Sequence, residues 1–141
     1  MRSNLLLVSV TLALLAGCAK TSPRSSTASP RAALDVYLMG LKQGNLAVVR
    51  SVYYSDRPDF QFHLSGPIPM ESYNITKELV FDTAEAKRHN ERGVVPPAEP
   101  ADVQLDVEER IDGQAEMYSY WLRLIDGKWL IYAHTAWNAP D

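Results

Sequence analysis

The stretch that decides the fold is residues 103–135, which read VQLDVEERIDGQAEMYSYWLRLIDGKWLIYAHT. It contains two Asp-Gly pairs, Asp112-Gly113 and Asp126-Gly127, each lying between segments in which apolar and polar residues alternate. Asp-Gly favours the two-residue type I′ turn of a β-hairpin, because both central positions of that turn need a positive φ. We therefore expect three consecutive antiparallel strands.

Two-residue turns also predict which residues lie opposite each other, since Ile111 must face Gln114 and Ile125 must face Lys128. On one face of the sheet this register aligns Val103 with Leu122 and Ile131, Leu105 with Tyr120 and Ala133, Val107 with Tyr118 and Thr135, and Leu124 with Trp129. On the other face it aligns Asp102 with Arg123, Gln104 with Trp121, and Asp106 with Ser119 and His134. The first face is continuously apolar, and a slip of one residue would destroy it.

Two helices are expected before the sheet. Ser29-Pro30 is typical of a helix start, and Gly44 of a helix end. Between them, apolar residues recur at helical spacing, at Leu34, Tyr37, Leu38 and Leu41. Asn45 then caps a second helix that carries Leu46, Val49, Val52 and Tyr53 on one face.

Between these helices and the sheet, the sequence predicts a further strand around residues 73–81. A short helix should follow, beginning with the capping box Asp82-Thr83-Ala84-Glu85 and ending near Gly93. Residues 94–100 hold three prolines and are expected to form a loop. The predicted fold class is α+β, with N-terminal helices packed on a curved antiparallel sheet of about four strands.

Composition limits the function classes. A chain of 141 residues is long enough for one domain with an adequate core. The formal net charge is −3, and the basic residues form no stripe. Nucleic acid is therefore not an expected partner, because binding to phosphates needs clustered Lys and Arg.

The N-terminus has the layout of an export signal, with Arg2 followed by an apolar run over residues 5–15 and then small residues. The tetrad Leu15-Ala16-Gly17-Cys18 resembles the lipobox of bacterial lipoproteins. This resemblance implies that residues 1–17 form a lipoprotein signal peptide, which is cut before a lipidated Cys18. Cys18 is the only cysteine, and an unpaired cysteine in an exported chain needs an explanation that lipidation supplies.

Residues 18–29 are then predicted to be the lipidated cysteine with a flexible polar tether, and residues 30–138 the folded domain. The expected membrane partner is reached through the acyl chains on Cys18. In a host with two membranes, the lipoprotein sorting rule and the absence of aspartate at Ala19 favour the outer membrane, with the domain facing the periplasm.

The domain resembles the NTF2-like superfamily, and in particular small exported lipoproteins with such a domain. The resemblance rests on residues 33–37, residues 41–45 and the stretch Tyr120–Trp129, and it covers roughly residues 30–137. It implies a curved sheet that wraps helices into a cone, often with a pocket inside. The superfamily includes isomerases, dehydratases and binding proteins, so fold analogy alone selects no function.

Inside such a cone, Tyr37, Tyr118 and Tyr120 have two interpretations. They line a pocket and donate hydrogen bonds to a developing oxyanion, as the resemblance to ketosteroid isomerase implies, or they are core aromatics. Glu109 and Glu116 fall opposite each other on the same face. They either share a proton, with one pKa raised, or form a solvated rim at the hairpin end.

On the outer face, Trp121, Leu130 and Tyr132 are neighbours. They predict an association surface for a homodimer or an envelope protein, because exposed aromatic clusters mark such surfaces. The alternative is that residues 56–70, which include Phe60, Phe62 and Ile68, cover them.

No metal site is expected, because His63, His89 and His134 lack the spacing of a metal motif. Asp56 and Asp59 are either a dehydratase-like pair or turn formers. No cofactor motif is present, and no catalytic residue is assigned. The sequence thus predicts a membrane-anchored envelope lipoprotein that is non-catalytic and binds a partner protein or a small apolar ligand. The alternative is an isomerase- or dehydratase-like enzyme with its site inside the cone.

Overall fold

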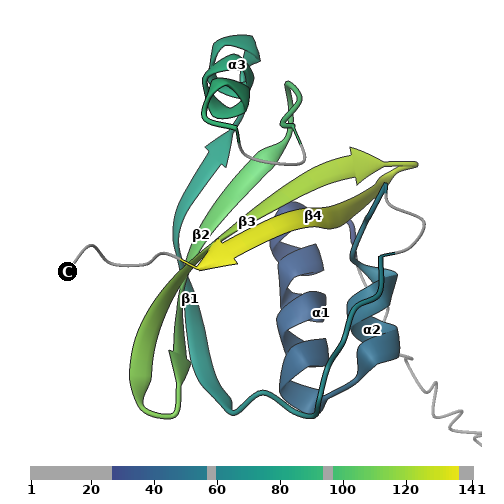
Figure 1. Ribbon diagram of the computed structural model, residues 1–141, viewed down its shortest axis with the longest axis vertical. Helices are drawn as coiled ribbons and strands as arrows, with labels where there is room; N and C mark the ends of the chain where they lie inside the picture. Colours follow the sequence, from purple (N-terminus) through teal and green to yellow (C-terminus); the bar gives the residue numbers. More distant parts are fainter. Residues whose placement is uncertain (1–26, 57–59, 94–96, 137–141) are drawn as a thin grey trace, which may run out of the picture.

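The computed structural model describes residues 27–56, 60–93 and 97–136 (Figure 1). The predicted signal peptide, Cys18, most of the tether and Asp59 lie outside the described residues. The elements in chain order are α1 (Pro30–Gln43), α2 (Leu46–Ser51), β1 (Met70–Val80), α3 (Thr83–Glu91), β2 (Val103–Ile111), β3 (Gln114–Ile125) and β4 (Lys128–Ala136). The four strands form one antiparallel sheet in the order β1-β2-β3-β4.

The sheet is curved and does not close, with α1 and α2 packed on its inner side and α3 at the far end of β1 (Figure 1). This confirms the α+β fold class. Of the helices in the described ranges, none has the length and apolar content needed to cross a bilayer.

The first helix begins and ends where the sequence predicts. The Ser29 hydroxyl accepts a hydrogen bond from the Ala32 N–H at 3.2 Å, and Pro30 occupies the first turn. Gly44 ends the helix with φ 65°, a conformation that glycine adopts without steric cost. Leu34, together with Tyr37, Leu38 and Leu41, lies in the main core.

A glycine sets the close approach of the two helices. A Cβ on Gly40 would lie 2.9 Å from Cγ2 of Val49, so any larger residue would force a shift where α2 packs on α1. The Asn45 side chain caps α2 by accepting from the Val48 N–H at 3.3 Å, and Val49 is fully buried. The predicted second helix is confirmed over Leu46–Ser51, but Tyr53, expected on its face, lies beyond its end and pairs with Ile131.

Both predicted Asp-Gly turns are confirmed. Asp112 and Gly113 have φ of 50° and 78°, and Asp126 and Gly127 have φ of 49° and 75°. In the β2–β3 hairpin, every pair from Ile111 with Gln114 to Val103 with Leu122 has the predicted partner.

The predicted register of β3 with β4 is correct only in part. It holds from Ile125 with Lys128 to Leu122 with Ile131, and then shifts by one residue because Tyr132 is inserted as a β-bulge. The predictions that placed Ala133 opposite Tyr120 and Thr135 opposite Tyr118 are therefore wrong. The observed pairs are Tyr120 with His134, Ser119 with Thr135, Tyr118 with Ala136, and Trp121 with Ala133. Alternation along a strand cannot reveal a bulge, since the extra residue reverses the faces of all later side chains.

The remaining elements match the predictions. β1 pairs with β2 and forms one edge of the sheet. The Asp82 carboxylate caps α3 by accepting from the Glu85 N–H at 2.8 Å. Two residues of α3, Ala86 and His89, pack in a second, smaller cluster on the outer face.

Candidate functional site: the cleft beside β4

The predicted outer aromatic surface is not exposed. Trp121 and Tyr132 keep only 6 % and 4 % of their surface accessible, and Leu130 is half-buried. The outer cluster that buries both rings consists of Phe81, Ala86, Ala98, Trp121, Tyr132 and Ala133, with Tyr54 at its border. The prediction of an exposed patch is wrong because α3 and the residues before β2 supply apolar side chains that cover it.

The alternative prediction, that residues 56–70 cover these side chains, is also wrong. Phe62 and Ile68, from the segment expected to cover the patch, pack instead against the main core on the inner face. Phe60 lies near Tyr53, with parallel rings whose centroids are 5.4 Å apart.

A buried ion pair ties the residues before β2 to the sheet. Asp102, which is 2 % exposed, accepts hydrogen bonds from Nε and Nη2 of Arg123 at 2.9 and 2.7 Å. The same carboxylate accepts from the Tyr132 hydroxyl at 2.9 Å and from the Glu99 N–H at 2.8 Å. The predicted Asp102–Arg123 neighbours thus form a bidentate pair, which is the strongest geometry for these groups.

The guanidinium of Arg123 has further partners. It meets the Glu99 carboxylate at 2.8 Å and the Pro97 carbonyl at 2.9 Å, and it lies 4.7 Å above the Tyr132 ring. The hydrogen bonds to Asp102 raise the pKa of Arg123 above its usual value. Burial, together with the charge of Asp102, raises the pKa of Tyr132. The cation is therefore fixed in place and stays charged.

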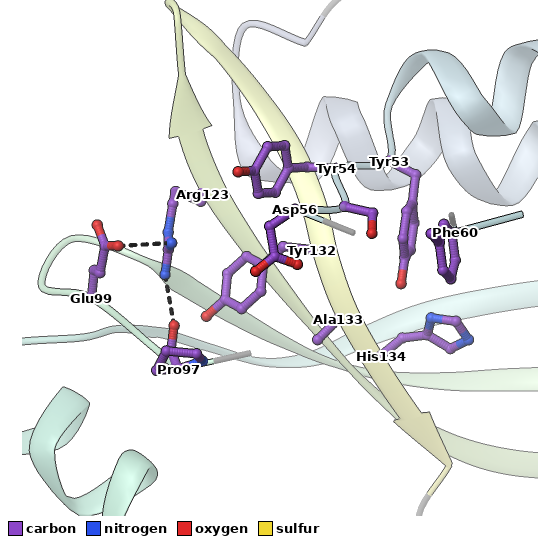
Figure 2. Close-up of a pocket in the computed structure, with 11 residues that line it drawn as sticks. Tyr53, Tyr54, Asp56, Phe60, Pro97, Glu99, Arg123, Tyr132, Ala133 and His134 are labelled. Atoms are coloured by element: carbon purple, nitrogen blue, oxygen red, sulfur yellow. Dashed lines mark hydrogen bonds and ion pairs between the residues drawn. The ribbon is translucent and has the colours of Figure 1, made fainter. Parts of the chain in front are cut away.

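Beside this ion pair lies an open cleft of about 500 Å³ (Figure 2). Its described lining consists of Tyr53, Tyr54, Ser55, Asp56, Phe60, Pro97, Glu99, Arg123, Tyr132, Ala133 and His134. Figure 2 shows Arg123 with its contacts to Glu99 and Pro97 on one side and the Tyr53–Phe60 pair on the other. Five of these eleven residues carry an aromatic ring, counting His134, and the charged side chains are Asp56, Glu99 and Arg123.

Main-chain pairing positions the aromatic wall. The Tyr54 N–H donates to the Ile131 carbonyl at 2.7 Å, and the Ile131 N–H donates to the Val52 carbonyl at 2.9 Å. This short parallel bridge holds Tyr53 and Tyr54 against the β4 edge. The bulge directly after Ile131 then places both Ala133 and His134 on the cleft.

His134 contributes an aromatic face rather than a charge. Its ring is stacked on Tyr120, with centroids 5.8 Å apart and planes 20° apart, while part of the side chain stays exposed to solvent. Burial of the imidazole lowers the pKa of His134 below its usual value. The imidazole is therefore neutral at pH 7.

The three inner tyrosines lie together but outside this cleft. Tyr37 and Tyr120 are buried in the main core with ring centroids 5.8 Å apart, and Tyr118 is half-buried beside Tyr120. None of them lines the 500 Å³ cleft. Burial raises the pKa of Tyr37 and Tyr120, so both phenols stay protonated.

Glu109 differs from the prediction of a solvated rim. It is 3 % exposed and accepts a short hydrogen bond from the Tyr120 hydroxyl. Burial raises the pKa of Glu109, although the bond from Tyr120 acts in the opposite direction. Glu116, opposite Glu109, is exposed and accepts from the Tyr118 hydroxyl at 2.5 Å. The rim interpretation therefore holds for Glu116 alone, because Glu109 is buried beside Tyr120, whose hydroxyl reaches its carboxylate.

The described parts of the chain contain no group of three or more His, Cys, Asp or Glu side chains able to hold a metal ion. His63 is exposed, His89 lies in the outer cluster between Phe81 and Trp121, and His134 borders the cleft.

Sequence reasoning missed the cleft because its two walls come from the loop after α2 and from the bulge in β4. Helical spacing predicts a helix face for Tyr53, and no sequence pattern marks Tyr54. The aromatic pairs Tyr53-Tyr54 and Phe60/Phe62 near the end of α2 were the signal available in the sequence.

Comparison with known proteins finds no matching family, no matching curated protein and no matching solved structure. The residues of the chain itself are therefore the basis for the function proposed below.

Proposed function

We propose that this chain is a membrane-anchored envelope lipoprotein whose domain is non-catalytic and binds a small, largely apolar ligand in the cleft beside β4. The anchor is the acylated Cys18, and the outer membrane, facing the periplasm, is the proposed location. The domain is proposed to be NTF2-like, which is supported by two helices packed inside a curved, unclosed antiparallel sheet.

The observation that carries the binding proposal is the cleft itself. Its volume of about 500 Å³ lies within the range of roughly 300–1,000 Å³ that is usual for small-molecule sites. Such sites combine a mostly apolar wall with a few placed polar groups. Here Tyr53, Tyr54 and Phe60 supply rings, and Arg123 with Glu99 supplies the fixed polar end.

The cleft is tested by titrating the mature chain, with Cys18 replaced by serine, with the neutral aromatic probe N-phenyl-1-naphthylamine. We expect saturable fluorescence at one probe per chain. Tyr54→Ala and Phe60→Ala should each weaken binding about tenfold, which corresponds to about 1.4 kcal/mol for one lost ring contact. Met39→Ala is the matched control, since Met39 is exposed and apolar but lies on α1 away from the cleft. Non-saturable binding, or an equal loss in the control, would contradict the proposal.

The anchor is tested separately by labelling cells with radioactive palmitate. The full chain should take up label and sediment with membranes, and Cys18→Ala should do neither. An unlabelled full chain would remove the anchor from the proposal without affecting the cleft.

A second candidate is the isomerase- or dehydratase-like enzyme with its site on the inner face. The observation that favours it is the buried Glu109, whose raised pKa and contact with Tyr120 are typical of a general base. We would follow isomerisation of a β,γ-unsaturated ketone by ultraviolet absorbance. The enzyme candidate requires turnover that Glu109→Gln abolishes, and absence of turnover would eliminate this reaction.

A further inference from the structure

A second hollow lies at the end of the sheet where the described chain begins, and two of its large apolar side chains are exposed. Val80 and Leu124 are 58 % and 55 % exposed, the largest exposed fractions among the bulky apolar residues described, and Trp129 beside them is half-buried. The hollow measures about 490 Å³. We call it the end patch and define it by Pro30, Val80, Pro100, Val103, Leu124 and Trp129.

The end patch is a continuation of the core face. Val80 pairs with Val103, and Leu124 pairs with Trp129, so their side chains share the face that α1 covers further along the sheet. Since α1 begins only at Pro30, the apolar face extends beyond the first turn of the helix and has no cover there among the described residues.

The chain enters the domain beside this patch. The Trp129 N–H donates to the Thr27 carbonyl at 3.0 Å, which fixes the position of the entering backbone. Thr27 is nine residues after Cys18. A segment of nine residues spans at most about 30 Å when fully extended.

We propose that the end patch rests on the surface of the bilayer that holds the Cys18 acyl chains, with Leu124, Val80 and Trp129 entering the headgroup region. This docking rests on the proposed lipid anchor. Because the tether keeps the patch near the surface, its effective local concentration is high and a small apolar area is sufficient. Tryptophan favours this interface, since its ring is apolar and its N–H is polar.

The charges around the patch largely cancel. Arg31 is paired with Glu78 at 2.7 Å, and Arg123 is paired with Asp102 at 2.7 Å and with Glu99 at 2.8 Å. These two cations and three anions carry one net negative charge. Contact with an anionic surface therefore meets the repulsion of a single charge, which salt screens.

The test uses the full lipidated chain in vesicles of phosphatidylethanolamine and phosphatidylglycerol at three to one. Lipidation converts the thiol of Cys18 into a thioether, so an introduced cysteine is the only reactive thiol. Leu124→Cys carries an environment-sensitive nitrobenzoxadiazole label on the patch. Gln114→Cys is the matched control, because it is exposed on the same strand but lies at the far hairpin, ten residues or roughly 33 Å along β3.

We expect the label at position 124 to shift to shorter wavelength on vesicles and to be quenched by doxyl-labelled lipid, while the label at position 114 does neither. Adding Val80→Asp should reverse the response at position 124. Equal responses at both positions would mean that the domain has no preferred face, and would overturn the docking. A response that needs no vesicles and grows with protein concentration would overturn it as well, because the occupant would then be a second copy. Failure of the chain to float with vesicles would instead refute the anchor.

Discussion

Replacing Asp102 with alanine should destabilise the domain by about 3–4 kcal/mol. The change leaves the Arg123 guanidinium without its bidentate partner, and breaking a buried pair from one side costs about 3–5 kcal/mol. It also removes the acceptor of the Tyr132 hydroxyl and of the Glu99 N–H. The lower part of the range applies, because the Arg123 side chain is 19 % exposed and keeps the Glu99 carboxylate.

The assay is urea unfolding of the mature chain with Cys18 replaced by serine, read by circular dichroism at pH 7. Glu108→Ala is the control, because Glu108 is an exposed acid on β2 and should change stability by less than about 0.5 kcal/mol. Arg123→Met combined with Asp102→Ala should cost less than the sum of the single changes, since the methionine leaves no buried charge unpaired. A loss below about 1 kcal/mol for Asp102→Ala, or additive costs in the double variant, would refute this account of the pair.

Three further changes test other parts of the fold. Glu109→Gln should stabilise the domain at pH 7. Burial raises the pKa of Glu109 in the folded state, so its contribution to the free energy of unfolding is fully present below the unfolded pKa near 4.5 and is lost as the pH rises. In urea titrations the extra stability of the variant should therefore vanish at about pH 4. A constant advantage across that window would argue against a buried acid. Ser29→Ala should cost about 1 kcal/mol through loss of the α1 cap, measured by thermal unfolding against Ser65→Ala, an exposed loop serine expected to be neutral. Gly40→Ala should lower the free energy of unfolding by about 1–3 kcal/mol, because the added methyl group would push α1 away from Val49. An unchanged midpoint of thermal unfolding would show that the two helices adjust without cost.

The sequence predicted those parts of the fold that local chemistry specifies. Asp112-Gly113 required its turn, and this turn set every pair of the β2–β3 hairpin. Ser29 and Gly44 marked the ends of α1. The β3–β4 register failed beyond Ile131, because no residue type in the strand signals an inserted position and alternation continues to look plausible on either face.

The candidate site was less predictable than the fold for a related reason. Burial of Trp121 and Tyr132 depends on α3, and the sequence of this helix does not predict which face of the sheet it packs on. The position of Glu109 near a hairpin end predicts a rim residue, but the residue is buried and accepts a hydrogen bond from the Tyr120 hydroxyl. Contacts between segments distant in sequence decide both outcomes, and a single sequence contains no direct signal for them.

The inserted Tyr132 interrupts the regular alternation of side chains between the two faces of β4. Before it, Ile131 serves the main core, and after it His134 returns to that same side while Ala133 turns outward. Deleting Tyr132 would leave Ala133 opposite Trp121 and His134 opposite Tyr120 in an unbroken register, so the residues after it would keep their faces. The insertion therefore adds one aromatic side chain to the cleft wall, and one hydroxyl donor to Asp102, without changing the pairing on either side of it.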